Sequence, residues 1–553
     1  MRPRTGIAAF ATLMTTAGVL AAAAAGATAA HASTSPHDGG RQGGPGFGRA
    51  TRLIPGDLLV STSYYRNDPN IVAGTTQLPP GCTGANCVTA IANGGYPQVF
   101  NNVTVDPSFG VTSPLYLKQI TTSGRPQGVI PVPTSELTTS FSSKSEDALN
   151  LSTDGRNVTF MGYVAAPDTV DASNSNTPGV FDPTNPVPGA NYRAVAQLSA
   201  NGRFTFTETN AYSGNNGRAA IEADVDGKSI FYTAGNAGNG SNPQPTGVVL
   251  GAGTQIITPS SRPEADQTVG QPTPVGSFSV TELGDKADKV GKDDNFRGLT
   301  ISGNVLYYTK GSGSNGVNTV YFLDTTGTAC PDGVGLPVPG AKLPTSGIES
   351  TLSSTGLASN MCILKGFPTA LAKNATDASD APFGLWFANP TTLYVADEGS
   401  GDSTFANGTF TADAASTTAG LQKWVFNAKS GEWQLAYTLQ NGLNLGAPYT
   451  VRGYPTGINS VTGLPWAPAT DGLRNLTGQV NRDGTVSIWA VTSTVSGGGD
   501  TGADPNKLVE ITDSLKAATA APHEQFRTVV PAEFDQVVRG VSFTPGTGVF
   551  GGR

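Results

Sequence analysis

Four arginines occupy one equivalent position in a repeated segment of the chain, and they are its clearest candidates for chemistry. Alignment of the first strand of each repeat places six residues at that position: Asp147, Arg218, Arg297, Phe383, Arg474 and Arg539. Guanidinium groups gathered in one place can bind a carboxylate, sulfate or phosphate through paired hydrogen bonds. The alternative is local pairing, because an aspartate (Asp294, Asp471 or Asp535) shortly precedes three of the arginines.

Carboxylates form the second set of candidates. The segment 397–402 reads DEGSGD, and its clustered oxygen ligands predict a calcium site at Asp397, Glu398 and Asp402, although the full EF-hand pattern is missing. Calcium is the one cofactor that the sequence suggests. Two carboxylates that flank a sugar bond could instead act as acid and base or nucleophile. The carboxylates considered for that role are Glu146 with Asp147, Glu208, Asp293 with Asp294, and Asp397 with Glu398. The competing interpretation is that each is a solvated loop residue.

Two aromatic side chains are candidates for stacking on a sugar ring. Tyr212 lies close to Arg218 in the sequence, and Trp466 lies in an insertion rich in glycine and proline. The other tryptophans fall inside predicted strands, where core packing is the expected role.

The few histidines exclude several common chemistries. There are three, His31, His37 and His523, and none is near the predicted site. A Ser-His-Asp triad, a histidine-ligated zinc or copper site and haem ligation each need such a histidine. A G-x-G-x-x-G pattern at 311–316 is followed by a predicted strand instead of a helix, so it does not indicate dinucleotide binding.

The chain has four cysteines, which predict two disulfides in an exported protein. Their positions favour Cys82 with Cys87 and Cys330 with Cys362 over the two other pairings. Zinc is the competing interpretation, and the spacing of the cysteines and the lack of a nearby histidine argue against it.

The N-terminal residues read as a secretory leader. Arg2 and Arg4 precede a long apolar run, and a small-x-small site ends at Ala32, which predicts a signal peptide over 1–32 and a flexible glycine-rich segment over 33–54. No later stretch is apolar enough to span a membrane. The net charge of -8 argues against nucleic acid and acidic membrane surfaces as partners. We expect a secreted monomer.

These candidates need a scaffold, and the internal repeat predicts which one. A short apolar strand, a tight turn and a strand rich in Tyr, Phe and Val recur five times, at 147–164, 218–235, 296–311, 382–399 and 473–493. Further strand pairs follow, so each unit has four antiparallel strands, as in a propeller blade. A sixth unit is split: 538–545 supplies its first strand and 56–64 its second. The sequence therefore predicts a single six-bladed β-propeller over 55–546 and a short tail over 547–553, with a seventh blade as the alternative.

Loop lengths predict where a site should lie. First-to-second turns are tight, whereas the loops assigned to the opposite face are long: 65–113, 165–191, 263–295, 326–381 and 441–472. Long loops on a rigid scaffold commonly carry binding and catalysis. The alternative is tolerated decoration, because a longer surface loop costs little entropy.

The segments RGLTIS, LYYTKG, TLYVADEG and VRGVSFTP, with the split closure and the leader, resemble secreted bacterial six-bladed propellers of the TolB-like and gluconolactonase-like kind. The resemblance implies the fold and matches no catalytic motif. We therefore predict that the propeller binds an extracellular glycan, anionic small molecule or protein through its long-loop face. The alternative is a carboxylate-dependent glycan hydrolase or lyase that uses the same face.

Overall fold

The computed structural model describes the greater part of the chain from residue 52 onward. The described residues are 52–65, 72, 74–78, 83–84, 87–90, 111–141, 147–169, 172–181, 187, 189–236, 253–265, 295–311, 316–330, 332–345, 360–372, 381–498 and 501–548. All of them belong to one compact unit, Phe47–Arg553. None of its described helices is long and apolar enough to cross a membrane.

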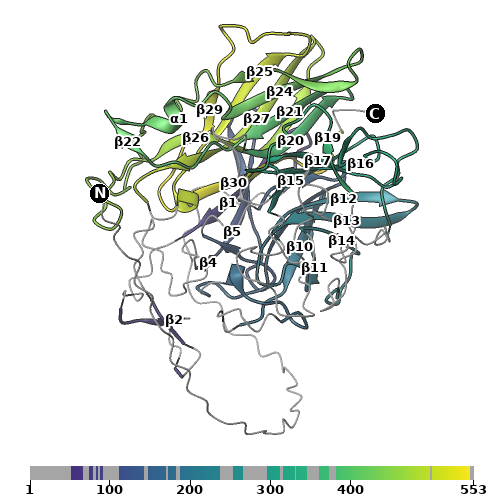
Figure 1. Cartoon of the computed structure of the whole chain (residues 1–553). Coiled ribbons are helices and arrows are strands. Elements are labelled where there is room, and N and C mark those ends of the chain that lie inside the picture. Colours follow the sequence, from purple (N-terminus) through teal and green to yellow (C-terminus); the bar gives the residue numbers. More distant parts are fainter. Residues whose placement is uncertain are drawn as a thin grey trace, which may run out of the picture. The chain divides into compact units, whose positions relative to one another are not determined.

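Six small antiparallel sheets form a six-bladed β-propeller, which confirms the predicted fold (Figure 1). Blade 1 contains β8 (Asn150–Leu151), β9 (Asn157–Tyr163), β10 (Arg193–Ser199) and β11 (Phe204–Thr209). Blade 2 contains β12 (Gly217–Val225), β13 (Lys228–Gly235) and β14 (Thr254–Ile257). Blade 3 contains β15 (Phe296–Ser302), β16 (Val305–Lys310), β17 (Thr319–Leu323), β19 (Met361–Leu364) and β18 (Val334–Gly335).

The remaining blades complete the ring. Blade 4 contains β20 (Pro382–Asn389), β21 (Thr392–Asp397), β24 (Gly420–Asn427) and β25 (Glu432–Leu439). Blade 5 contains β26 (Ala469–Val480), β27 (Thr485–Val495), β28 (Leu508–Ser514) and β29 (Arg527–Val530). Blade 6 contains β30 (Gln536–Phe543), β1 (Leu58–Tyr64), β5 (Leu115–Ile120) and β6 (Pro126–Pro131).

Short elements lie outside the blades. Among the described residues they include β2 (Gln77–Leu78), β3 (Val88–Thr89), β4 (Thr112–Ser113), β7 (Thr139–Ser140), β22 (Phe405–Ala406), β23 (Thr409–Phe410), the helix α1 (Thr411–Ala414) and 3₁₀ turns at Ala172–Asn174 and Thr501–Ala503.

The predicted closure of the ring is confirmed. Strand β30 pairs with β1 from Leu58 opposite Phe543 to Tyr64 opposite Gln536, so the last strand of the propeller is the inner strand of the blade that the first strand begins. A hydrogen bond of 2.8 Å from the Gly56 amide to Thr547 Oγ1 adds to this contact. Closure removes the two open edges that a linear array of blades would expose.

The inner strands of the six blades, β8, β12, β15, β20, β26 and β30, surround the axis, and each contacts the inner strands of both neighbouring blades. Apolar side chains fill the space between adjacent sheets: one buried cluster joins Tyr232 of blade 2, Tyr321 of blade 3 and Trp424 of blade 4. The core is therefore a ring of layers between blades, and it holds the inner strands in fixed positions around the axis.

The turns between the first and second strands are tight, as predicted. Asp226 and Gly227 both have positive φ (53° and 78°), as do Gly303 and Asn304 (57° and 61°). Positive φ at both central residues is typical of the type I′ turn, whose twist matches that of the flanking strands.

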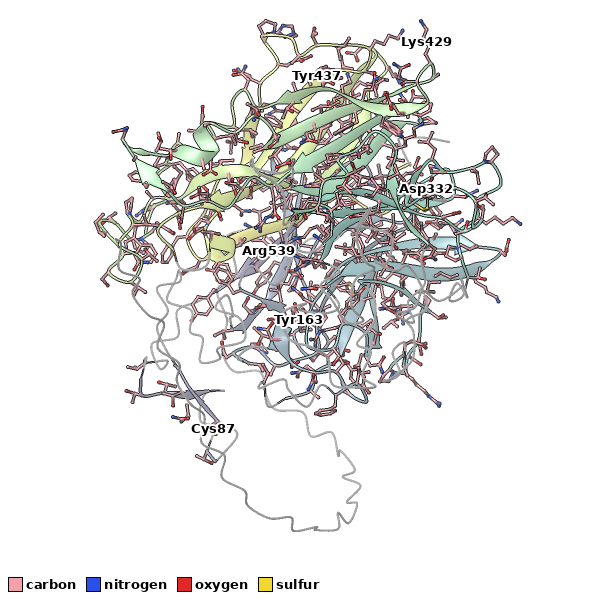
Figure 2. The ribbon with its side chains drawn as sticks, viewed as in Figure 1. Cys87, Tyr163, Asp332, Lys429, Tyr437 and Arg539 are labelled. Carbon is pink, nitrogen blue, oxygen red and sulfur yellow. A yellow bond between two sulfur atoms is a disulfide. The ribbon has the colours of Figure 1, made fainter. Side chains whose placement is uncertain are left out.

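Blade 3 differs from the prediction. The sequence predicts that 326–381 is one long loop on a single face, but β19 divides it, because β19 pairs antiparallel with β17 as the fourth strand. The connection between β17 and β19 therefore joins a third strand to a fourth, so its described ends lie on the face of the tight turns. Asp332 of this connection is labelled in Figure 2. Long connections thus occur on both faces.

The same connection contains the confirmed disulfide, Cys330–Cys362. It fastens the start of the connection to β19, and β18 adds a parallel strand to β19 there. Cys87 is also disulfide-bonded, but Cys82 lies outside the described residues, so their pairing stays a prediction.

Candidate functional site

The aligned arginines occupy β-bulges of the inner strands. In five of the six blades the inner strand has one extra residue relative to its partner at this point: Arg218 in β12, the pair 297–298 in β15, the pair 383–384 in β20, the pair 474–475 in β26 and Arg539 in β30. A bulge interrupts the ladder and redirects a side chain. The position that the sequence alignment singled out is therefore a distinct structural position, repeated around the axis.

A small residue follows the bulge residue in several blades, because neighbouring inner strands touch there. A Cβ on Gly298 would lie 2.2 Å from the carbonyl oxygen of Phe383, and a Cβ on Gly384 would lie 2.6 Å from that of Arg474. A Cβ on Gly540 would lie 2.7 Å from the carbonyl oxygen of Asp147. These contacts place the aligned residues of adjacent blades at one level of the axis.

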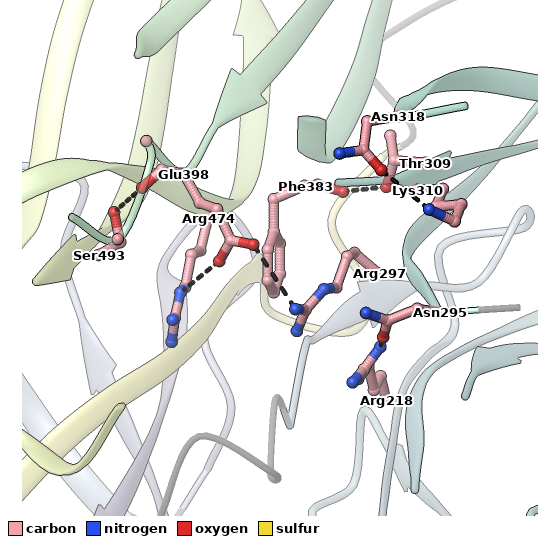
Figure 3. A network of polar contacts seen from close by, with 12 residues as sticks. Arg218, Asn295, Arg297, Thr309, Lys310, Asn318, Phe383, Glu398, Arg474 and Ser493 are labelled. Atoms are coloured by element: carbon pink, nitrogen blue, oxygen red, sulfur yellow. Dashed lines mark hydrogen bonds and ion pairs between the residues drawn. The ribbon is translucent and has the colours of Figure 1, made fainter. Parts of the chain in front are cut away.

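At this level Glu398 joins two of the arginines (Figure 3). Its carboxylate accepts a hydrogen bond of 3.1 Å from Arg474 Nε and lies 3.7 Å from an Arg297 nitrogen. The Phe383 ring lies between the two guanidinium groups, whose central carbons are 5.6 and 5.7 Å from the ring centroid. The Arg297 and Arg474 side chains keep 13% and 16% exposure. Two solvent-reached cations thus share one carboxylate.

The other aligned residues are more deeply buried. The Arg218 guanidinium donates to the Asn295 side chain and, at 3.1 Å, to the Phe296 carbonyl. Arg539 Nε donates to Ser63 Oγ at 3.1 Å, and the residue lies among the inner strands (Figure 2). The Asp147 carboxylate accepts a hydrogen bond from Thr139 Oγ1. Arg218 and Arg539 are each only 3% exposed, so Arg297 and Arg474 are the aligned arginines that solvent reaches.

The two aromatic candidates lie in different surroundings. Tyr212 is fully buried, with its hydroxyl hydrogen-bonded to Thr233 Oγ1, so its ring packs blades together and is not positioned to stack on a sugar. Its buried place corrects the sequence-based expectation, which rested only on closeness to Arg218 in the chain. Trp466 is half-buried against Tyr454, with the ring centroids 6.1 Å apart.

The three carboxylates predicted to bind calcium face different partners. Asp397 accepts hydrogen bonds from the amides of Ala381 and Gly399 at 2.8 and 3.0 Å. Asp402 is exposed, and hydrogen bonds from Thr404 lower its pKa. Glu398 pairs with the arginines, and the three carboxylates do not form one of the close groups of metal-ligand side chains found among the described residues. Calcium at this set stays a prediction.

Glu208, a candidate for acid–base chemistry, lies on β11, the outer strand of blade 1. Burial, and then the charge of Glu136, raise its pKa. Because β11 is the outer strand, Glu208 lies far from the axis of the propeller. Glu146, Asp293 and Asp294 lie outside the described residues.

The inner strands also line a cavity of about 120 Å³ on the tight-turn side of the bulges. Each inner strand contributes at least one residue to the wall of this cavity: Leu151, Ile221, Thr300, Phe387, Leu476 and Phe543. The side chains here are apolar or uncharged polar ones, such as Asn150, Ser152 and Thr153, in contrast with the charged level above. The axis therefore has a charged end and an uncharged end.

The comparisons with known proteins identify no family for this chain. No known protein family matches the sequence, and no curated protein is similar to it. Solved structures that resemble it include a cobalt-substituted apocarotenoid oxygenase from Synechocystis, at 8% identity and a TM-score of 0.29, over 89% of this chain and 93% of that one. Others are an ancestral GH74 enzyme, at 10% identity and a TM-score of 0.25 over 87% and 63% of the two chains, and a B. megaterium levansucrase variant, at 9% and 0.21 over 88% and 94%. TM-scores this low carry no argument about activity.

Proposed function

We propose that this chain is a secreted ligand-binding propeller, of the TolB-like and gluconolactonase-like architecture, that binds an anionic ligand at the charged end of its axis. The apolar N-terminal run and the Cys330–Cys362 disulfide support export. The ligand class that fits is one with a carboxylate or sulfate group, such as an acidic oligosaccharide.

One observation carries this proposal: arginine stands at the bulge in four of the five bulged inner strands. Bulges are common next to active sites, where they redirect a side chain. A buried charge is costly unless another group compensates it. Strand packing alone would therefore not explain why the same position carries a cation in four blades.

Glu398 is the group with which an anionic ligand would compete at this site. It neutralises one of the two solvent-reached guanidinium groups and spaces them on either side of Phe383. The carboxylate of a ligand would compete with that of Glu398 for the same donors. Each charge-assisted hydrogen bond to the ligand should contribute about 1.5–3 kcal/mol.

The test is a calorimetric titration with acidic and neutral oligosaccharides of matched length. Arg297→Ala with Arg474→Ala should weaken binding of the acidic ligand at least about tenfold, whereas Glu398→Gln should strengthen it. Arg125→Ala removes the same charge from an exposed turn between β5 and β6 and should change nothing. If the arginine and glutamate changes have opposite effects on affinity, the charge of these residues is the cause, because damage to the fold would weaken binding in both variants.

Equal affinity of wild type and the double arginine variant would refute the proposed site. The same samples should be analysed for new reducing ends and unsaturated sugars. Their formation would favour the rival function, a carboxylate-dependent glycan hydrolase or lyase, over simple binding.

A further inference from the structure

Two buried carboxyl groups face each other beside the charged end of the axis, and no function given above uses them. Asp413 lies in α1, within the insertion between β21 and β24, and Asp471 lies at a second irregularity of β26. They are 1% and 3% exposed, and they lie within hydrogen-bonding distance of each other. The pair therefore connects the insertion of blade 4 to the inner strand of blade 5.

Each group has one oxygen with a donor and one without. Asp471 Oδ2 accepts a hydrogen bond of 3.0 Å from the Gly401 amide, and Ser400 Oγ lies 3.5 Å from Asp413 Oδ1. The other oxygens, Asp413 Oδ2 and Asp471 Oδ1, are buried and accept no hydrogen bond from any described donor. Carboxylates are acceptors only, so two of them in contact need a proton or a cation between them.

The surroundings favour a positive ion. Besides burial, the groups that raise the pKa of this pair are carboxylates: Asp402 acts on Asp413, and Glu398 acts on Asp471. Burial raises the pKa of Asp413 to about 6 and holds that of Asp471 well above its usual range. Both carboxyl groups are therefore harder to ionise than an ordinary aspartate.

We propose that a calcium ion binds between Asp413 and Asp471. The available ligands are all oxygens, which excludes the thiolate and imidazole sites typical of zinc and copper. Calcium accepts irregular sets of carboxylate, hydroxyl and water oxygens, whereas magnesium demands a near-ideal octahedron and gives up its waters reluctantly. The turn at Ser400, Gly401 and Asp402 is exposed, so an ion has a short path to the buried pair.

The ion would fix the loop that contains Glu398. A Cβ on Gly399 would lie 1.9 Å from Asp471 Oδ1, so the loop 398–401 rests directly on this carboxylate. Calcium would replace the repulsion between the two aspartates with attraction to both. The loop would then hold Glu398 in place between Arg297 and Arg474.

The test is calcium binding to the full chain, measured by isothermal calorimetry and by the change in Tm between calcium and a chelator. Wild type should bind one ion at this site and melt at a higher temperature in calcium. Asp413→Asn with Asp471→Asn should weaken binding at least about 100-fold, because loss of an outer partner alone costs about 10–100-fold. Asp332→Asn, a change at an exposed carboxylate, should leave calcium binding intact.

The double variant should fold without calcium, because two amides can hydrogen-bond where two carboxylates repel. Far-ultraviolet circular dichroism checks that it does. The proposal is overturned if wild type shows neither calcium binding nor a shift in Tm, since the pair then holds no calcium. It is also overturned if the double variant keeps the full calcium response. Neither readout depends on the anionic ligand, so this proposal and the proposed function fail separately.

Discussion

Replacing Gly298 with alanine should destabilise the propeller by forcing two inner strands apart. The new Cβ would lie 2.2 Å from the Phe383 carbonyl oxygen and 3.3 Å from the Gly384 Cα. Normal carbon–oxygen contacts are about 3.3 Å or longer, so relief requires a movement of about 1 Å between β15 and β20. Overpacking of this kind typically costs about 1–3 kcal/mol. Alanine also lowers the conformational entropy of the unfolded chain, but this effect stabilises the folded state by only about 0.4–1 kcal/mol.

The assay is urea unfolding of the variant beside wild type and Gly189→Ala. The Cβ of the control would lie 3.6 Å from Asn191 Nδ2, an ordinary contact, so the control should keep the entropic gain and be about 0.4–1 kcal/mol more stable than wild type. Gly298→Ala should be about 1–3 kcal/mol less stable than that control, because the entropic gain is common to both variants. Because Phe383 lies between the partly buried guanidinium groups of Arg297 and Arg474, the variant should also lose affinity for the acidic ligand. Unchanged stability and affinity would show that the strands have room at this level, which would refute the close-contact argument.

Three further changes test other parts of the fold. The Tyr308 hydroxyl is buried without a described hydrogen-bond partner, so Tyr308→Phe should leave Tm unchanged or raise it; a clear fall would contradict this. Lys423 and Asp513 form a fully buried ion pair of 3.0 Å, so Lys423→Met should cost about 3–5 kcal/mol in urea unfolding, and Asp513→Asn added to it should recover part of the loss. Burial acts to raise the pKa of Asp324, but hydrogen bonds from Thr326, Ala329 and Gly327 outweigh it and lower the pKa. The stability that Asp324 contributes is therefore present above its unfolded pKa and is lost as pH falls through its folded pKa. The difference in free energy of unfolding between wild type and Asp324→Asn should therefore shrink below about pH 4. A difference that stays constant with pH would refute the assignment.

The sequence predicted the ring because every blade repeats the same inner strand. The match between 538–545 and the other first strands was enough to pair it with 56–64, as β30 and β1 confirm. The tight turns followed from Asp-Gly and Gly-Asn pairs, whose positive φ the turn type demands. Alignment of the first strands also found the position that the structure shows to be bulged.

What the sequence missed depends on contacts between distant segments. Strand β19 has only four residues, Met361–Leu364, and follows a long connection, so its apolar run gave no clear period. Asp413 and Asp471 meet only because α1 packs beside β26. The bulges themselves leave one readable trace, the small residue after Arg297, Phe383 and Arg539, which marks where neighbouring strands touch.

The pairing of β1 with β30 also decides when folding can finish. Gly56 and Thr547, which hydrogen-bond across this seam, are separated by 491 positions in the chain. Bringing together the ends of so long a segment costs about 5 kcal/mol in chain entropy, and the first strand must wait for the last one to be made. Until then, blade 6 lacks the strand that faces the axis. A chain truncated before β30 should therefore keep five complete inner strands, but its ring should stay open. The unpaired strand edges should then make it prone to association.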